Sequence, residues 1–253
     1  MSKELVMVYI SALPIILILL YVYNRDKEKE PVLLLLELFG LGMLSCFAVL
    51  AFSNSLDRLF PSISYQSSKS FIELLLYSFI RVALIEESCK WTVLFIRGYL
   101  HKEFDEIYDI IVYSVFVSLG FAFLENITYI LVTSNFYVAL LRGVTAIPGH
   151  ACNAIFMGYY LSYAKEYHYQ RNTKKETNKI ILSIIVPTIL HGIYDFCLLL
   201  ESSLFIYIFL FFITSLIIIS IKKLKEVSIN NKKIVENEKS NNFYYYNQTT
   251  SQE

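Results

Sequence analysis

Seven long apolar runs, separated by polar connectors, dominate the pattern of the chain. An apolar run of about 20 residues is long enough to cross the hydrocarbon core of a bilayer as a helix. The pattern therefore predicts an all-α, polytopic membrane bundle with about seven transmembrane helices. The predicted spans cover residues 5–23, 32–54, 70–97, 107–133, 136–163, 179–200 and 203–221.

The connectors and the C-terminal end of the chain have a different composition. Residues 24–31 and 165–179 are rich in charged side chains. After the last apolar run, residues 222–253 begin basic, end in polar residues and lack an apolar period. We predict a membrane-embedded domain over 1–221, with its core at 70–200, followed by a disordered cytoplasmic tail over 222–253.

The basic residues predict the orientation of the chain, because cytoplasmic loops of membrane proteins carry an excess of Lys and Arg. With the N-terminus outside, sixteen Lys and Arg residues lie in inner segments. Only four lie in outer segments, namely Lys3, Arg58, Lys69 and Arg142. We expect a multi-pass plasma-membrane protein with its N-terminus outside, its C-terminus in the cytoplasm and an odd number of spans.

The composition agrees with a membrane protein and gives no indication of a nucleic-acid partner. Apolar residues make up 56% of the chain and charged residues 17%, and the mean hydropathy is +0.51. Lys+Arg and Asp+Glu balance at 22 each, so no basic surface predicts a nucleic-acid partner, and the expected surroundings are the lipid bilayer. The four cysteines lie in apolar stretches without CxxC spacing, which predicts buried thiols instead of disulfides or a zinc–thiolate site.

Ionisable residues near the middle of four consecutive predicted spans are the main departure from this apolar pattern. A lone charge at the centre of a spanning helix costs about 2.5–3.5 kcal/mol on insertion scales. Such residues usually face the bundle interior or a water-filled cavity and belong to a functional site. The candidates are Glu86, Glu87, Lys90, Glu125, His150, His191 and Asp195, with Asn126 beside Glu125 as an amide donor.

Helical spacing groups several of these candidates. Lys90 follows Glu86 and Glu87 at i+4 and i+3, so its ammonium can reach both carboxylates. Two carboxylates this close do not both ionise cheaply unless Lys90 or a metal compensates their charge. His191 and Asp195 are also spaced at i+4 and share a helix face.

Prolines and two further charges complete the pattern. Pro148 and Pro187 predict helix breaks in the fifth and sixth spans, since proline removes a helix hydrogen bond. Arg81 is expected to pair with Glu73 or a lipid phosphate and is left outside the site. Glu37, in the second span, is either a helix contact or a minor residue of the site.

This set of side chains allows two kinds of hydrolytic chemistry. It can activate a water and stabilise an oxyanion without a metal, which is the version we favour. It can also hold a divalent metal such as zinc with one position open for water. The candidate metal ligands are Glu86, Glu125, His150, His191 and Asp195.

Less demanding explanations exist for each group taken alone. Glu86, Glu87 and Lys90 can form a structural ion pair, and His191 with Asp195 a helix-stabilising hydrogen bond. Because the polar sets occur in four consecutive spans, one shared cavity is the simpler explanation. A proton or ion transporter and a catalytically silent membrane scaffold remain the alternatives to an enzyme.

Four motifs, in order, resemble those of the PrsW family of intramembrane proteases. EESCK at 86–90 matches EExxK, FAFLE at 121–125 matches FxxxE, and HGIYD at 191–195 matches HxxxD. PGHACNAIFMGYY, which contains His150, is similar to the family's histidine-centred motif. The resemblance covers about 70–200, and Tyr108 departs from the small or flexible residue common at that position.

The resemblance implies that the chain hydrolyses a peptide bond of a membrane-spanning protein. In bacterial members this is the first cleavage of an anti-sigma factor, which leads to sigma-factor release. By this similarity, Glu86 or Glu87 polarises the attacking water, and His191 and His150 stabilise the oxyanion or carry protons. Lys90, Asn126 and Asp195 orient those groups, and Glu125 is a supporting acid or a metal ligand.

Overall fold

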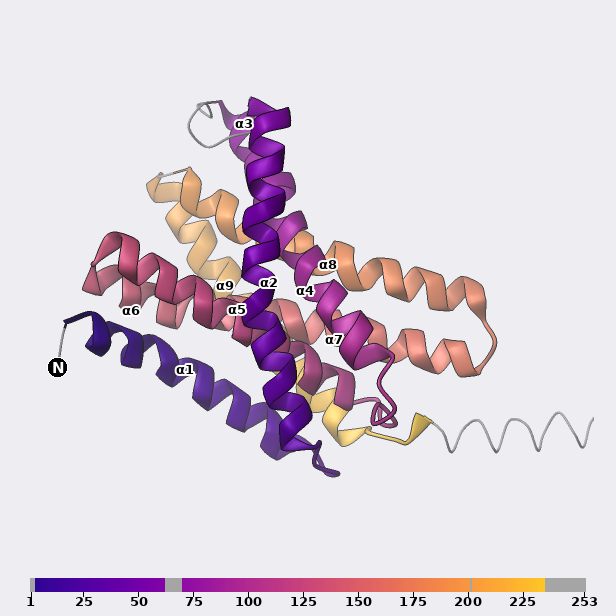
Figure 1. Cartoon of the computed structure of the whole chain (residues 1–253). Helices are drawn as coiled ribbons and strands as arrows, with labels where there is room; N and C mark the ends of the chain where they lie inside the picture. Colours follow the sequence, from indigo (N-terminus) through magenta and orange to yellow (C-terminus); the bar gives the residue numbers. More distant parts are fainter. Residues whose placement is uncertain (1–2, 62–69, 201, 235–253) are drawn as a thin grey trace, which may run out of the picture.

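The computed structural model describes residues 3–61, 70–200 and 202–234. Within these ranges every long element is a helix, and β pairing is confined to a single bridge between Glu106 and Lys233. The predicted all-α bundle is therefore confirmed (Figure 1). All four cysteines are free thiols; Cys152 and Cys197 are buried as predicted, whereas Cys46 and Cys89 are only partly buried.

Among the described residues, five helices are long and apolar enough to cross a membrane. They are α1 (Lys3–Arg25), α2 (Val32–Leu59), α5 (Asp109–Thr133), α8 (Thr173–Leu199) and α9 (Ser203–Ile229). Their outward faces carry large apolar side chains such as Leu33, Tyr207 and Phe211, each more than 70% exposed. A bilayer would cover this apolar surface, because soluble proteins rarely expose such large apolar patches to water.

The predicted third span is one continuous helical rod with changes of winding. It contains α3 (Phe71–Leu76), η2 (Tyr77–Leu84), α4 (Ile85–Leu94) and η3 (Phe95–Tyr99), where the η segments are π-helical. Wider π turns inside α-helices are frequent at functional sites. Here they flank α4, the segment that carries the paired glutamates.

The two predicted proline breaks have different outcomes. The fifth span divides at Thr145 into α6 (Phe136–Val144) and α7 (Ala146–Tyr169), so the single span predicted over 136–163 is wrong. Pro148 lies in the first turn of α7, where a missing donor costs little. The break expected at Pro187 is absent, because α8 continues through that residue.

The C-terminal end of the described chain is more ordered than predicted. α9 continues to Ile229, beyond the predicted end of the last span at 221. The next segment pairs with the connection before α5, since Ile107 donates its amide to the Lys232 carbonyl at 3.3 Å. The rest of the predicted tail, 235–253, lies outside the described residues.

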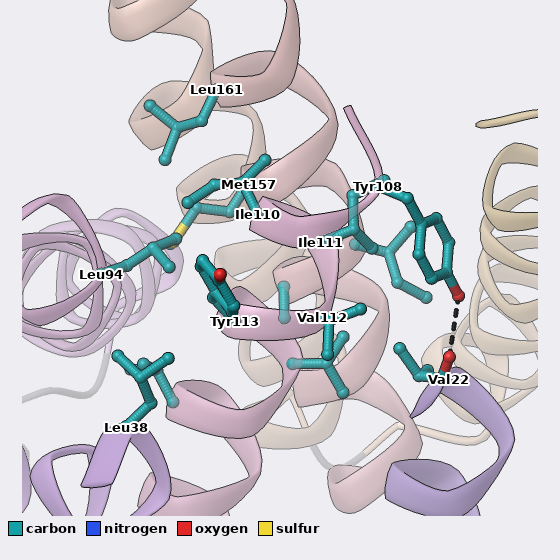
Figure 2. Close-up of a cluster of buried hydrophobic side chains, with 14 of the residues drawn as sticks. Val22, Leu38, Leu94, Tyr108, Ile110, Ile111, Val112, Tyr113, Met157 and Leu161 are labelled. Atoms are coloured by element: carbon teal, nitrogen blue, oxygen red, sulfur yellow. Dashed lines mark hydrogen bonds between the residues drawn. The ribbon is translucent and has the colours of Figure 1, made fainter. Parts of the chain in front are cut away.

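The central helix is α5, which packs against α1, α2, α4, α6 and α7. Its first turns fill the main apolar core together with Leu38 of α2, Leu94 of α4 and Met157 of α7 (Figure 2). Tyr108, noted above as a departure from the family pattern, is fully buried there. Its hydroxyl donates to the Val22 carbonyl at 3.1 Å, which ties the start of α5 to α1.

Close backbone contacts fix the helices around α5. A Cβ atom added at Gly42 of α2 would lie 2.0 Å from the Val117 carbonyl oxygen. One added at Gly120 of α5 would lie 2.0 Å from the Phe39 carbonyl oxygen. Glycine is therefore required at both positions, and small residues of this kind are what allow helices to approach closely in membranes.

Helices α7 and α8 form an antiparallel hairpin (Figure 1). Because they lie side by side, His150 of α7 and His191 of α8 meet with their ring centroids 5.3 Å apart.

Candidate active site

Helix α4 supplies three buried charged residues at the bottom of the site. The exposed fractions of Glu86, Glu87 and Lys90 are 7%, 0% and 1%. The Lys90 Nζ atom lies 2.8 Å from Glu87 Oε1, 3.4 Å from Glu86 Oε2 and 3.2 Å from His150 Nδ1. The three N–H donors of the ammonium group thus meet three acceptors. The Phe121 ring closes the remaining side, with its centroid 4.2 Å from Nζ.

His191 of α8 is fixed through one ring nitrogen and presents the other. Its Nδ1 atom lies 2.8 Å from Glu87 Oε1. An ionised carboxylate only accepts hydrogen bonds, so Nδ1 carries the proton. The opposite nitrogen, Nε2, lies 3.4 Å from Asp195 Oδ2 and 3.8 Å from Glu86 Oε2. Glu87 therefore orients the ring, and Nε2 faces the two other acids.

His150 of α7 joins α4 to α5. Its Nε2 atom lies 2.9 Å from Glu125 Oε2, while Nδ1 accepts from Lys90. These two contacts place the proton of the neutral ring on Nε2. The Ser118 hydroxyl donates to the His150 backbone carbonyl at 3.0 Å, which holds α7 against α5 at this level.

Arg142 of α6 is the residue that sequence reasoning missed. Its guanidinium forms an ion pair with Glu125 at 2.8 Å, donates to Asn126 Oδ1 at 2.7 Å, and lies 3.8 Å from the Tyr129 ring centroid. The sequence pattern assigned Arg142 to an outer segment. The available signal was its position as a lone charge in the apolar run FYVALLRGVTAI, where an arginine needs a partner.

All eight predicted site residues thus lie in one connected network built from α4, α5, α7 and α8, with Arg142 of α6 linking Asn126 to it. Two other charged residues lie elsewhere. Arg81 pairs with Asp57 at 2.8 Å, so the partners expected for it, Glu73 or a lipid phosphate, are not the ones found. Glu37 pairs with Arg97 at 2.6 Å and is a helix contact outside the site.

Two adjoining pockets open onto this network. The smaller has a volume of about 20 Å³ and is lined by Glu125, Arg142, His150, His191 and Asp195, among others. A volume of roughly 10–15 Å³ suffices for one water, so this pocket can hold one. The larger has a volume of about 400 Å³ and is lined by Glu86, Glu125, Arg142, His191 and Asp195, together with Tyr77, Tyr129 and Tyr194. Glu87 lines neither pocket.

The depth of the site follows from the helix bounds. Glu125 lies eight residues before the end of α5 at Thr133, and His191 eight residues before the end of α8 at Leu199. Eight residues correspond to about 12 Å of helix, whereas the start of α5 is about 24 Å away. The site is therefore nearer to the membrane face on which the α5–α6 and α8–α9 connections lie.

Buried acids, imidazoles and an arginine thus surround a pocket inside a helical membrane bundle, an arrangement that can support hydrolysis. The family model described as "PrsW family intramembrane metalloprotease" matches residues 30–220. The chain belongs to this family of intramembrane peptidases.

Relatives named "Protease PrsW" support this membership. The one from Clostridioides difficile strain 630 is 31% identical over 207 residues, which is 81% of this chain and 83% of the relative. The one from Oceanobacillus iheyensis is 39% identical over 200 residues, 79% of this chain and 86% of the relative. The one from Bacillus subtilis strain 168 is 39% identical over 158 residues, 62% and 70% respectively. No solved structure gives a significant match.

The family description names a metal, and the donor set fits one. Among the described residues, Glu86, His150 and His191 each offer a ligand atom within 4.8 Å of the others. Two imidazoles and a carboxylate are a common zinc set that leaves one position open. The Lys90 ammonium lies among these donors and would compete with a cation. Glu125 and Asp195, also expected as ligands, contact the histidines instead.

Proposed function

We propose that the chain hydrolyses a peptide bond of a membrane-anchored protein in the larger pocket, with Glu86 activating the water. The observation that carries this proposal is the unequal placement of the two α4 acids. Glu86 lines the pocket, whereas Glu87 is fully buried behind it and holds Lys90 and His191. One acid is thus free to meet water, and the other has a positioning role.

Glu86 accepts a proton as the water oxygen attacks the carbonyl carbon of the substrate. Lys90 lies 3.4 Å from this carboxylate and stabilises its ionised form before the attack. His191 Nε2 lies 3.8 Å from Glu86 Oε2, so it receives the proton that Glu86 took from the water and transfers it to the leaving amide nitrogen as the C–N bond breaks. The products are a new carboxyl group and a new amino group.

The Arg142 guanidinium stabilises the negative charge that develops on the substrate oxygen, and Glu125 holds that guanidinium in place. The guanidinium lines both pockets, where a fixed positive charge is worth more than in bulk water. Glu125 holds the guanidinium on one side and the His150 ring on the other.

A divalent metal bound by Glu86, His150 and His191 would supply Lewis-acid polarisation of the same water. The structure provides supporting acids for such a role, because Glu87 and Glu125 each bond one nitrogen of a histidine ring. The test is elemental analysis of the purified active protein and of its His191→Ala variant. A metal role predicts about one zinc ion per wild-type chain and a clear loss in the variant, whereas the metal-free mechanism described above predicts an active protein without zinc. Full activity without a transition metal would contradict a metal role.

The proposed substrate is an anti-sigma factor with one membrane-spanning helix, cut in the outer half of the bilayer. The excess of basic residues on the side of the α1–α2 and α7–α8 connections supports a cytoplasmic location for that side. The site lies nearer to the opposite face, which would then be the outer one. A relative's name, "Protease PrsW", agrees with proteolysis and names no substrate.

The function is tested by co-expressing a tagged candidate anti-sigma factor with the protein and following membrane fragments by immunoblot. We expect Glu86→Gln and His191→Ala to abolish the fragment without loss of protein from the membrane. Glu37→Gln is the matched control, because Glu37 contacts Arg97 outside the site. A fragment produced equally by all variants would rule out the proposed site.

A further inference from the structure

A second cluster of buried acids lies at the opposite end of α5 from the candidate active site. Asp26 comes from the α1–α2 connection, Glu106 from the connection before α5, and Asp109 from the first residue of α5. Their exposed fractions are 4%, 7% and 0%. One oxygen of each lies within 4.8 Å of the others. Asp109 precedes Glu125 by sixteen residues, or about 24 Å of helix, so the two sites are separate.

Several carboxylate oxygens in this cluster have no hydrogen-bond partner among the described residues. Both carboxylate oxygens of Asp26 and Oδ1 of Asp109 are buried without a hydrogen-bond partner in the part of the chain that the structure describes. By contrast, Asp109 Oδ2 accepts from the amides of Asp105 and Glu106, and Glu106 Oε2 accepts from Asn231. Leaving a buried carboxylate unpaired is costly, so these oxygens indicate a missing ligand.

The neighbouring cations do not fill this role. Lys29 directs its ammonium to the backbone carbonyls of Tyr23 and Asp26, at 2.5 and 2.7 Å. Lys233 pairs with Glu28 at 2.7 Å. The Arg25 guanidinium lies over the Tyr21 ring, 5.0 Å from its centroid.

A fourth acid adds to the negative charge. Glu30 accepts a hydrogen bond from the Tyr113 hydroxyl and lies beside Asp109. Burial raises the pKa of Asp26 to about 6 and the pKa of Glu30 to about 7. Desolvation is the largest cause of both pKa shifts; neighbouring acids raise the two pKa values further, while Lys29 lowers that of Asp26.

We propose that Asp26, Glu106 and Asp109 bind a hard divalent cation, with Mg²⁺ as the expected ion. The donors are carboxylate oxygens without an imidazole or thiolate, a set that suits Mg²⁺ or Mn²⁺ better than zinc. Mg²⁺ retains several waters when it binds to a few carboxylates, so three protein ligands are sufficient.

The cation would fasten two segments that are distant in sequence, and hydrogen bonds join a third segment to them. Asp26 belongs to the connection between α1 and α2, and Glu106 and Asp109 to the start of α5. The segment after α9 joins them, because Asn231 Oδ1 accepts from the Tyr108 amide at 3.0 Å and the Ile234 amide donates to the Asp105 carbonyl at 2.7 Å. The proposed site is therefore structural and independent of peptide hydrolysis.

The test measures Mn²⁺ binding to the full-length protein in detergent by electron paramagnetic resonance, after chelation, with Mg²⁺ as competitor. Asp26→Asn is the main variant, because the replaced oxygens have no partner and the change preserves shape. Glu28→Gln is the control, a nearby exposed acid that pairs with Lys233. We expect Mg²⁺-displaceable Mn²⁺ in the wild type and the control, and at least about tenfold weaker binding in Asp26→Asn.

Thermal unfolding gives a second measurement on the same samples. Added Mg²⁺ should raise the midpoint for the wild type and Glu28→Gln, and should leave Asp26→Asn unchanged, because a ligand stabilises only the state that binds it. Absence of Mn²⁺ binding to the wild type, or equal binding and equal shifts in Asp26→Asn, would overturn the proposal.

Discussion

Glu87 and His191 are 104 residues apart in sequence, yet Glu87 Oε1 lies 2.8 Å from His191 Nδ1. The same oxygen lies 2.8 Å from Lys90 Nζ. This buried carboxylate therefore couples a cation on its own helix to an imidazole on α8. It sets the tautomer and the direction of the ring that faces the pocket.

Glu87→Gln should destabilise the protein and reduce cleavage together. Removing one partner of a buried ion pair costs about 3–5 kcal/mol, because the other charge remains buried. Lys90→Met should have a similar effect alone, and the double variant should lose less stability than the two single losses added together. Unfolding in mixed micelles measures this coupling. Strictly additive losses would show that the two side chains are not coupled.

Arg142→Lys should reduce cleavage while leaving the protein in the membrane. Lysine cannot contact Glu125 and Asn126 at once and also lie flat on the Tyr129 ring. By analogy with removal of an oxyanion-stabilising donor, we expect a loss of about 10²-fold in turnover rate. Arg97→Lys is the matched control, since that arginine pairs with Glu37 on an exposed face. Equal activity of both variants would remove Arg142 from the site.

Gly192→Ala tests whether the close contact between α8 and η2 positions the histidine. A Cβ atom at Gly192 would lie 2.5 Å from the Phe79 ring, whereas one at Gly40 would meet nothing within 4 Å. Gly192→Ala should therefore displace α8 and lower cleavage, and Gly40→Ala should not. Gly192→Ala combined with Phe79→Ala should recover part of the activity. Failure of this second change to restore anything would argue against the steric explanation.

Cysteine labelling tests the proposed orientation. Asn135→Cys lies in the α5–α6 connection and Arg171→Cys in the α7–α8 connection. A membrane-impermeant maleimide should label Asn135→Cys in intact cells and Arg171→Cys only after permeabilisation. The unsubstituted protein gives the background of its four free thiols. The reverse pattern would place the site nearer to the cytoplasmic face.

Local helix geometry explains which parts of the site the sequence could predict. The spacing of Glu86, Glu87 and Lys90 gives their mutual contacts directly, because i+3 and i+4 residues share a helix face. The motif order brings His150, His191 and Glu125 into the same prediction. Their convergence requires only that four neighbouring spans turn their polar faces inward.

The remaining features depend on contacts that no local pattern encodes. Arg142 reaches Glu125 because the chain divides at Thr145, and a hydropathy pattern merges α6 and α7 into one span. Arg81 pairs with Asp57 of α2 because of the way α2 and η2 pack. Asp26 lies in the α1–α2 connection and Asp109 at the start of α5, and no apolar period indicates that the two lie together.

Peptide-bond hydrolysis in the pocket lined by Glu86 can be measured by cleavage of a purified membrane-anchored substrate in liposomes containing H₂¹⁸O, with mass spectrometry of the new C-terminus. We predict ¹⁸O incorporation at the cut by the wild type and Glu37→Gln, and a rate at least about 10²-fold lower for Glu86→Gln. If Glu86→Gln cleaved the substrate and incorporated ¹⁸O at the wild-type rate, Glu86 would not be the residue that activates the water.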